Sequence, residues 1–421
     1  MSLRVLFIAT SSNASPARGG RRRIVDVAHQ TIRLGIKARI LCFLPCEQVM
    51  RGWVFLKNGK ASLANESGVP VRYWPMLPLT RFLWIDRLNA WYCGVVTALF
   101  CEFYCVNITY GHGLGAARLA LVARCLRKSL RVIADIHGAG VAEYTYQKQL
   151  QKDDRMIQRL ETLEKQVITK SDQIIFVSHR MYCYYKDKLN QEITNHTVLP
   201  CAINTFFTVD RHKREDLRRE YHLADHLVVA YAGSAVAYQR VEEMCVLFKE
   251  IQQLHSNAHF LILSHHRQKF ENSINQNEIN PTDVTILSVD HGQVFDLLQI
   301  GDVGLMLRDG SIVNQVASPT KFAEYLMCGL PVLTTPHVGD YSQYVTDHNL
   351  GHIVDLDNLS VDPALETFLQ DVIENRAFYS KRCVNFVSQH LVWDQLGNQL
   401  GQVFSQLTDR TISINTEESS R

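Results

Sequence analysis

The chain has 421 residues, of which 46% are hydrophobic and 20% are charged, and its formal net charge is +2. This composition excludes a disordered protein, and the near-neutral balance excludes a general attraction to nucleic acid. The length exceeds that of one ordinary core, so we expect two domains. Eleven cysteines without a Cys-x-x-Cys pair favour a reducing compartment and hence a cytoplasmic protein.

Short apolar runs alternate with longer segments that are polar on one side, in both halves of the chain. Near-continuous apolar runs are typical of parallel strands that helices cover on both faces, so the pattern predicts two α/β domains. The strands expected in the first half are residues 4–10, 38–44, 131–137 and 173–178. Those expected in the second half are residues 227–233, 259–264, 284–288, 303–308 and 331–335.

We place the first domain at residues 1–200 and the second at residues 201–390. A helical pattern that begins at Phe378 predicts a C-terminal helix, whose last part, residues 391–407, follows the second domain. Residues 408–421 are polar and without periodicity, so we expect a disordered tail. A charged run at residues 211–219 alternates in sign, which predicts a solvated helix face.

Residues 83–106 form the most apolar long segment of the chain. Asp86, Arg87 and Glu102 interrupt it, so no run of about 18 uncharged residues exists and a membrane span is not expected. The pattern predicts a core helix. Contact of its aromatic side chains with a membrane surface stays open as an alternative.

Ligands of open parallel sheets bind beyond the carboxyl ends of the strands, so the residues that follow each expected strand are candidates. After the first strand, Gly19 and Gly20 mark a turn from a loop into a helix, where a glycine lets a ligand approach the backbone. A plain tight turn is the alternative. The basic residues that follow, Arg21–Arg23, favour an anionic or lipid-linked partner.

His137 ends the third expected strand, and Gly138 follows it. An imidazole at a strand end suits a polar catalytic contact, although a lone histidine is more often structural. Glu143 either orients His137 or serves the start of the next helix. In the second half, His265 and His266 follow a strand, but no carboxylate stands at metal-ligand spacing, so we expect no metal.

Two further strand ends and one helix start carry groups that bind phosphate. Ser234 and Arg240 enclose the loop after residues 227–233, and Arg308 ends another strand; hydroxyls and guanidiniums together can hold a diphosphate. In Ser318-Pro319-Thr320-Lys321, Ser318 suits an N-cap and Pro319 a first helical turn, so the free amides and Lys321 would meet an anion. Glu324 follows on nearly the same helix face, where it can accept the hydroxyls of a ribose.

Three segments resemble one family in order and spacing. SPTKFAEYLMCGLPV (residues 318–332) is similar to the donor-binding element of GT-B-fold glycosyltransferases, and more narrowly of the retaining, family 4-like enzymes that build bacterial capsule, O-antigen and exopolysaccharide. DIHGAGVAEY (residues 135–144) resembles their Asp-x-His-Gly segment, and YAGSAVAYQR (residues 231–240) resembles their Tyr-x-Gly-Ser…Tyr-Gln loop.

The resemblance implies two Rossmann-like domains facing across a cleft, with a C-terminal helix that crosses back to the first domain. It also implies a metal-independent, retaining transfer of a hexose from a nucleoside-diphosphate sugar to a polysaccharide or lipid-linked glycan, without a cofactor. The donor would bind the second domain and the acceptor the first. The expected partners are these two substrates and no nucleic acid, and peripheral contact with the inner face of the plasma membrane is left open.

The family pattern assigns a role to each matching residue. Lys321, with the amides of the turn, would hold the diphosphate, and Glu324 would hold the ribose. His137 would contact the donor sugar, which makes it, with Lys321 and Glu324, a catalytic candidate. The residues that would assist in binding are Gly20, Ser234, Arg240, Arg308, Ser318, Pro319 and Thr320.

Two departures leave alternatives open. Many relatives carry a second glutamate where this chain has Val316, so the sugar contact would come from Arg308, Asp309 or Asn314. Cys201-Ala202 replaces an Asn-Gly hinge. The alternatives are a sugar-nucleotide epimerase of the same fold, with His137, Glu143 and the His265–His266 pair as acid–base groups, and a catalytically degenerate partner subunit.

Overall fold

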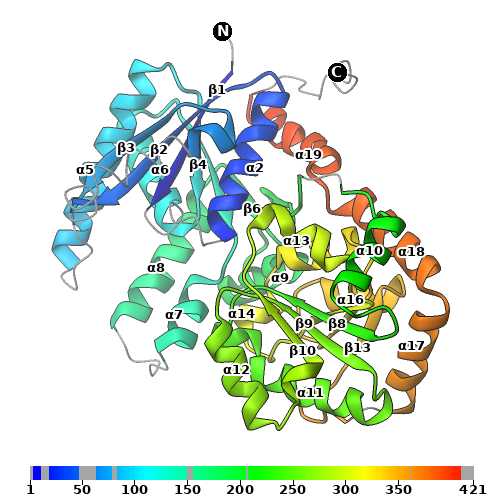
Figure 1. Ribbon diagram of the computed structural model, residues 1–421. Coiled ribbons are helices and arrows are strands. Elements are labelled where there is room, and N and C mark those ends of the chain that lie inside the picture. The colour runs from blue at the N-terminus through cyan, green and yellow to red at the C-terminus, as the bar shows by residue number, and fades with distance from the viewer. Residues whose placement is uncertain are drawn as a thin grey trace. The chain divides into compact units, whose positions relative to one another are not determined.

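The computed structural model describes residues 3–10, 19–46, 63–77, 83–148, 155–204, 207–360 and 362–408. These residues form two compact units (Figure 1). One unit comprises the chain up to Cys201 together with the segment from Trp393 onward, and the other comprises Ala202–Val392.

The first unit is built on a parallel sheet of seven strands in the order β3-β2-β1-β4-β5-β6-β7. The strands are β1 (Arg4–Thr10), β2 (Lys37–Pro45), β3 (Val71–Met76), β4 (Ile108–His112), β5 (Arg131–Ile136), β6 (Gln173–Phe176) and β7 (His196–Val198). The helices are α2 (Gly19–Arg33), α5 (Leu83–Phe103), α6 (Leu114–Leu126), α7 (Gly140–Lys148), α8 (Arg155–Lys170), α9 (His179–Leu189) and α19 (Trp393–Gln406).

Helices cover both faces of this sheet, which explains why its strands are apolar throughout. Leu6 and Ile8 of β1 share a core with the inner sides of α5 and α6, and Figure 1 shows α2 and α19 on the other face. α19 packs on α2, and Asp394 forms an ion pair with Arg33. The predicted return of the C-terminal helix to the first domain is therefore confirmed.

The second unit repeats the design with six parallel strands in the order β10-β9-β8-β11-β12-β13. The strands are β8 (Leu227–Ala232), β9 (Ala258–Leu263), β10 (Val284–Leu287), β11 (Val303–Met306), β12 (Val332–Thr334) and β13 (Gly351–Ile353). The helices are α10 (Arg211–Glu220), α11 (Val241–Leu254), α12 (Arg267–Gln276), α13 (His291–Leu298), α14 (Ile312–Gln315), α15 (Thr320–Met327), α16 (Tyr341–Asp347), α17 (Pro363–Glu374) and α18 (Arg376–His390).

Side chains of β8 alternate between two cores, as the period of two of a strand requires. Val228 and Ala230 pack with α13, α15 and α18, whereas Leu227, Val229 and Tyr231 pack with α11, α12 and α17. Both sheets thus have the strand order of a doubly wound Rossmann-like fold, which confirms the predicted fold class.

All nine predicted strands are present within two residues of their expected bounds, and four further strands, β3, β4, β7 and β13, escaped prediction. The single helix expected from Phe378 to residue 407 is wrong. The chain forms α18 and α19 instead, because Leu391 and Val392 leave helical geometry and Ile203 pairs with them in a short bridge. Residues 409–421, where the tail was expected, lie outside the described residues.

The charged helix α10 has the solvated face that its sequence predicts, with Arg211, Asp216 and Arg219 exposed, and it also has a buried face that the sequence did not reveal. Asp302, which is 7% exposed, accepts hydrogen bonds from Arg214 at 2.6 Å and Arg218 at 3.1 Å, and from the amide of Val228 at 2.8 Å. Arg218 is 6% exposed. A buried carboxylate 84 residues away in sequence therefore holds α10 against the sheet.

No helix in the described residues combines the length and apolar character that a membrane crossing requires. The expected apolar helix is α5, which packs on the core and on β3 and leaves another side exposed. All eleven cysteines lie in the described part of the chain, and each is a free thiol.

Candidate functional site

Each sheet reverses its strand order at one point, and doubly wound sheets bind ligands beyond the carboxyl ends of the strands there. The reversal lies between β1 and β4 in the first sheet and between β8 and β11 in the second. β4 ends at His112, β8 leads into Gly233 and Ser234, and Arg308 follows β11 closely. These two places, one in each unit, are the candidate sites.

Lys321 lies in the first turn of α15, with its side chain buried beside β8. Its Nζ donates to the Tyr231 hydroxyl at 3.2 Å and to Oε1 of Gln239 at 2.7 Å. Gly233 has a φ of +148°, and a Cβ there would lie 2.8 Å from this Nζ, so the glycine makes room for the lysine. Burial, and then the charge of Arg308, lower the pKa of Lys321 well below its ordinary value.

Arg308 is the second buried cation of this site, and it is 4% exposed. One terminal nitrogen donates to the Tyr238 carbonyl at 3.0 Å, and the guanidinium lies 4.7 Å from the centre of the Tyr238 ring. Its Nε is buried without a hydrogen bond to the described residues, and burial lowers the pKa of Arg308. Among the described residues, no carboxylate forms an ion pair with Arg308 or Lys321, and the pairs nearby belong to Arg240.

The start of α15 differs from the predicted cap. The N-cap is Pro319 and not Ser318, whose hydroxyl instead shares a hydrogen bond of 2.7 Å with the Tyr341 hydroxyl. No side chain of the described chain caps α15, so the amides of Thr320 and Lys321 keep their capacity to bind an anion.

Glu324 stands one turn after Lys321 and is partly exposed, whereas the residues on either side of it are buried. Its charge raises the pKa of Lys321, although burial outweighs that effect. The structure therefore brings Lys321, Arg308 and Glu324 together at one end of the sheet, as the sequence predicted.

Two other predicted binding residues lie at the rim of this site. The Ser234 carbonyl accepts a hydrogen bond of 2.7 Å from the Tyr231 hydroxyl, which fixes the loop after β8. Arg240 has a φ of +55°, pairs with Glu243 and stands 3.9 Å from Asp309. Arg240 is thus partly neutralised by carboxylates, in contrast to Arg308.

The position of the missing second glutamate, one residue weighed as its substitute and one histidine weighed as an acid–base group have different environments. Val316 is 2% exposed and part of the core. The Asn314 amide donates to Oδ1 of Asp309 at 2.8 Å and to Oγ of Ser311 at 3.1 Å, so it is used within its own loop. His265, after β9, is exposed and shares a hydrogen bond with Ser288.

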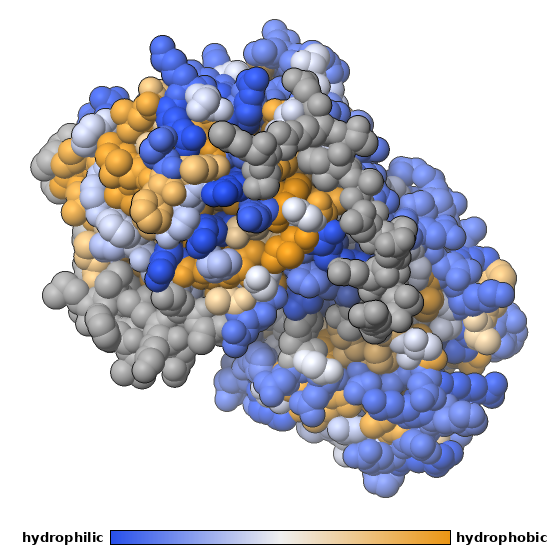
Figure 2. Space-filling view, turned by 90° about the horizontal axis from the view of Figure 1, so that it is seen from above, coloured by the Kyte–Doolittle hydropathy of each residue, from blue (hydrophilic) through white to orange (hydrophobic). Residues whose placement is uncertain are grey.

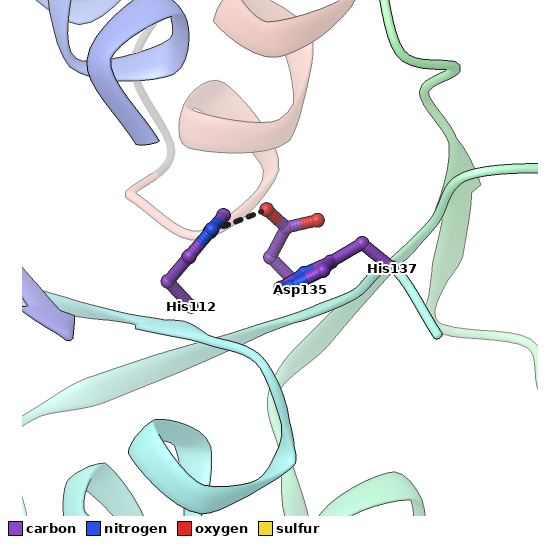
Figure 3. A group of neighbouring side chains, drawn as sticks. All are labelled: His112, Asp135 and His137. Carbon is purple, nitrogen blue, oxygen red and sulfur yellow. Dashed lines mark hydrogen bonds and ion pairs between the residues drawn. The ribbon is translucent and has the colours of Figure 1, made fainter. Parts of the chain in front are cut away.

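The first unit has a buried charged cluster at the end of β4 and β5. The Arg23 guanidinium donates to both oxygens of Asp135, at 2.9 Å for each, and to the Leu199 carbonyl at 3.0 Å. His112 lies within 3.2 Å of the Asp135 carboxylate through Nδ1 and within 2.7 Å of the Gly20 carbonyl through Nε2 (Figure 3).

Burial alone would raise the pKa of Asp135, but the charges of Arg23 and His112 and their hydrogen bonds outweigh it. They hold the pKa of Asp135 well below its usual range. The carboxylate is therefore ionised and paired, which makes this cluster complete by itself.

The imidazole of His137, which follows β5, stacks on His112 with ring centres 4.3 Å apart (Figure 3). Burial, and then the charge of His112, lower the pKa of His137 to about 3, so it is neutral at pH 7. Its Nδ1 is buried without a hydrogen bond to the described residues. Gly113, with a φ of +83°, packs under the ring, because a Cβ there would lie 3.3 Å from Cε1.

Glu143 lies in the first turn of α7 and against Gly138, where a Cβ would meet its Oε1 at 1.9 Å. Burial, and then the charge of Glu164, raise the pKa of Glu143. The structure thus places Glu143 at the start of the helix that follows His137, and no hydrogen bond among the described residues joins the two side chains.

His112, Asp135 and His137 offer ligand atoms within 4.8 Å of one another, the spacing of a metal site. Their chemistry does not fit a cation. Both oxygens of Asp135 already accept from the Arg23 guanidinium, and His112 directs both nitrogens at acceptors. A metal ion would have to displace a buried positive charge, so we assign no metal to this cluster.

The basic run after Gly20 does not present its charge as predicted. Arg21 is buried and pairs with Glu66 at 2.9 Å, and Arg23 pairs with Asp135. Arg22 pairs with Asp26 at 3.2 Å, although 42% of its side chain is exposed. The expectation that Arg21 and Arg23 attract an anionic partner is therefore wrong, because carboxylates of the first unit already hold them. Arg18 lies outside the described residues.

Sequence reasoning missed Arg23, His112 and Asp135 as members of a site. His112 carried a usable signal, since Gly113 follows it at a strand end just as Gly138 follows His137. The pairing of Arg23 with Asp135 carried none, because 112 residues separate them.

Comparison with known proteins agrees with this geometry. Residues 213–381, which include Lys321, Arg308 and Glu324, match the family model of the Glycosyl transferases group 1. A search of curated proteins finds no match.

The fold as a whole is similar to solved glycosyltransferase structures. Anabaena Alr3699/HepE in complex with UDP-glucose has a TM-score of 0.69 at 13% identity, with 96% of this chain and 100% of that chain covered. Sucrose-phosphate synthase from Thermosynechococcus elongatus has a TM-score of 0.70 at 15% identity, with 97% and 99% covered. WaaG, a glycosyltransferase involved in lipopolysaccharide biosynthesis, has a TM-score of 0.63 at 13% identity, with 94% and 99% covered.

These structures share the GT-B fold with this chain. Together with the family match in the second unit, they support a glycosyltransferase.

Proposed function

We propose that this chain transfers a hexose from a nucleoside-diphosphate sugar to a polysaccharide or lipid-linked glycan, without a metal ion and with retention of configuration. The reaction would take place in the cytoplasm. The observation that carries the proposal is the pair of buried cations, Lys321 and Arg308, which have no carboxylate partner among the described residues.

Burying a cation without a counter-ion is costly, so a folded protein keeps such a pair where a ligand supplies the negative charge. A diphosphate fits, because Lys321, Arg308 and the amides that begin α15 are all donors. Positive charge at this place would also stabilise the nucleoside diphosphate as it leaves, the task that a metal ion performs in other enzymes. Ser234 and Arg240 would assist at the rim.

One carboxylate and one imidazole complete the assignment. Glu324, partly exposed beside Lys321, would accept the ribose hydroxyls. Neutral His137 would exchange a hydrogen bond with the donor sugar, and the Arg23–Asp135–His112 cluster would hold its ring. Gly20 would leave room for the acceptor or the diphosphate.

The comparisons support a sugar donor and a glycan acceptor. Anabaena Alr3699/HepE was solved with UDP and glucose, and WaaG is involved in lipopolysaccharide biosynthesis. By analogy, a UDP-linked hexose is the first donor to test and a lipid-linked oligosaccharide is the first acceptor.

The test is a thermal-shift screen of nucleoside diphosphates and their sugars, followed by mass analysis of products with the best binder. A ligand at about 100 times its Kd should stabilise the protein by about 2.7 kcal/mol. Lys321→Ala should weaken binding by about ten- to hundred-fold, because a charge-assisted contact is lost. Lys381→Ala is the control, since Lys381 is exposed and in the same unit.

The screen separates the alternatives. A donor that isomerises without an acceptor identifies an epimerase. Absence of stabilisation by every diphosphate, with identical behaviour of Lys321→Ala and Lys381→Ala, contradicts a nucleotide site in the second unit and leaves a degenerate partner subunit.

Proton linkage gives a second measurement. The pKa of Lys321 is lowered in the free protein, and a bound diphosphate would raise it again. Binding should therefore take up protons and weaken as the pH rises. Calorimetry in two buffers of different ionisation enthalpy measures this uptake, which should vanish in Lys321→Ala.

A further inference from the structure

The outward side of α5 is apolar along its length, which is unusual for a helix on the surface of a unit. Leu88, Trp91, Leu99 and Phe103 are 50%, 58%, 65% and 80% exposed. With the partly exposed Val95 they follow at intervals of three or four residues, so they form one stripe, the α5 stripe, about 22 Å long. Figure 2 shows hydrophobic residues gathered on the left of the molecule, the side where α5 lies in Figure 1.

The core of the first unit does not need this stripe. The opposite side of α5 supplies Ala90, Cys93, Val96 and Cys101 to the core over the sheet. A third side is fixed to β3, where the Trp74 indole donates to the Tyr92 hydroxyl at 2.8 Å. α5 is therefore anchored on its inner sides, and the stripe remains open to a partner.

The apolar surface continues onto α6. Arg127, just after α6, forms an ion pair of 3.2 Å with Glu102, near the end of α5. This pair brings the ends of the two helices together, and there Leu126 is 53% exposed and Phe103 is 80% exposed.

Charge is distributed very unevenly over the chain, a feature that the total of +2 conceals. The first unit, residues 1–201 and 393–421, contains 30 lysines and arginines against 18 aspartates and glutamates, whereas residues 202–392 contain 14 against 24. The unit that carries the α5 stripe is thus strongly basic, and the other unit is acidic. Charge asymmetry of this kind is typical of proteins that bind an anionic surface.

We propose that the α5 stripe docks on the surface of a membrane that contains anionic lipid. Leu88, Trp91, Leu99 and Phe103 would enter the boundary between head groups and acyl chains, with α5 lying parallel to the surface, while the basic unit is attracted by the lipid charge. Charge argues against a second copy of the chain, because it would bring two basic units together. Single-stranded nucleic acid stacks on aromatic rings, whereas Leu88 and Leu99 make half of these four side chains aliphatic. This docking does not depend on the proposed function.

The test is co-sedimentation of the full chain with vesicles of phosphatidylglycerol and phosphatidylcholine, and with vesicles of phosphatidylcholine alone. We expect binding to the anionic vesicles that weakens in high salt. The triple variant Trp91→Gln/Leu99→Gln/Phe103→Gln should bind at least ten-fold more weakly. Its control is Leu254→Gln/Ile373→Gln/Phe378→Gln, which removes exposed apolar residues of the acidic unit and should bind as the wild type.

A second readout keeps the test decisive if the triple variant folds poorly. Trp91 fluorescence should shift to shorter wavelength on binding and be quenched by brominated lipid, and Trp91→Phe should bind normally but lose that signal. Equal binding by the triple variant and its control overturns the proposal. So does a wild-type dimer that the triple variant dissociates without lipid, or RNA binding that depends on the stripe. A triple variant that no longer binds vesicles but is still stabilised by a nucleoside diphosphate would have lost only the docking surface. The docking proposal and the proposed function can therefore fail separately.

Discussion

The two buried charged sites of this protein differ in one respect, which is whether the protein itself balances the charge. In the first unit, Asp135 lies between Arg23 and His112, and its oxygens accept from both. In the second unit, Lys321 and Arg308 are equally buried, but no carboxylate of the described residues pairs with them. The first site is complete as folded, whereas the second is complete only with an anion.

The difference indicates how the two sites divide their tasks. A balanced, fully hydrogen-bonded cluster holds geometry, and here it holds the ring of His137. An unbalanced cluster lowers the free energy of unfolding of the free protein, and a bound anion raises it again. The same residue types therefore serve a structural role in one unit and a binding role in the other.

The largest expected effect comes from removing the carboxylate of the balanced site. Asp135→Asn leaves Arg23 buried without its counter-ion, so we expect a loss of about 3–5 kcal/mol in the free energy of unfolding. Chemical denaturation of the two proteins measures it.

Glu66→Gln is the matched control, because it removes the partner of Arg21, which lies in α2 as Arg23 does. Glu66 is 46% exposed, so the loss should stay at about 0–1 kcal/mol. Equal losses in the two variants would contradict the view that the Asp135 cluster is a balanced buried site.

A smaller effect should appear as pH dependence of stability through His137. Its pKa is about 3 in the folded chain, against an ordinary value of 6.5, because it is buried beside His112, with Arg23 and Asp135 close by. Between these values the unfolded chain binds a proton that the folded chain does not, so stability falls as the pH drops below 6.5 and is unaffected above it. The loss should reach about 2 kcal/mol at pH ~5.

The measurement is the difference between the wild type and His137→Gln across this range. A difference is needed because burial also lowers the pKa of His259, in the second unit, to about 4, and His259 titrates in the same window. The variant should lose less stability on acidification than the wild type. Parallel curves would mean that His137 is not held neutral by the cluster.

Most of the fold could be predicted from the sequence, because buried parallel strands are apolar throughout. The strands that escaped were those with polar or breaking residues. β3 contains Arg72 and Pro75, which an edge strand tolerates, and β4 contains Gly111 and His112. The predicted helix from Phe378 failed because apolar periodicity continues through Leu391 and Val392, where the backbone turns.

The unbalanced site was predictable and the balanced one was not, for a physical reason. Arg308 and Ser234 each follow a strand closely, and Lys321 lies at the start of α15, a helix between β11 and β12, so topology brings them to one end of the sheet. Ion pairs such as Arg23 with Asp135, or Arg218 with Asp302, join residues far apart in sequence, and no local pattern encodes them. The same cause made the prediction for the arginines after Gly20 wrong and left the buried face of α10 unforeseen.

The smallest effect on stability should come from the unbalanced site. It tests most directly whether the two sites differ in how their charge is balanced. Lys321→Met keeps the length of the side chain and removes a buried charge that has no carboxylate partner in the described chain. The lost hydrogen bonds to Tyr231 and Gln239 oppose the gain, so we expect a change between zero and an increase of about 2 kcal/mol.

Denaturation of Lys321→Met without ligand measures this change, and the same variant should lose the stabilisation that a nucleoside diphosphate gives the wild type. The comparison with Asp135→Asn is decisive, because removing a charge from the first unit should lower the free energy of unfolding, whereas removing one from the second unit should not. A loss of several kcal/mol in Lys321→Met would show that the protein balances this charge itself. The anion would then have no missing charge to supply, and the second site would be as complete as the first.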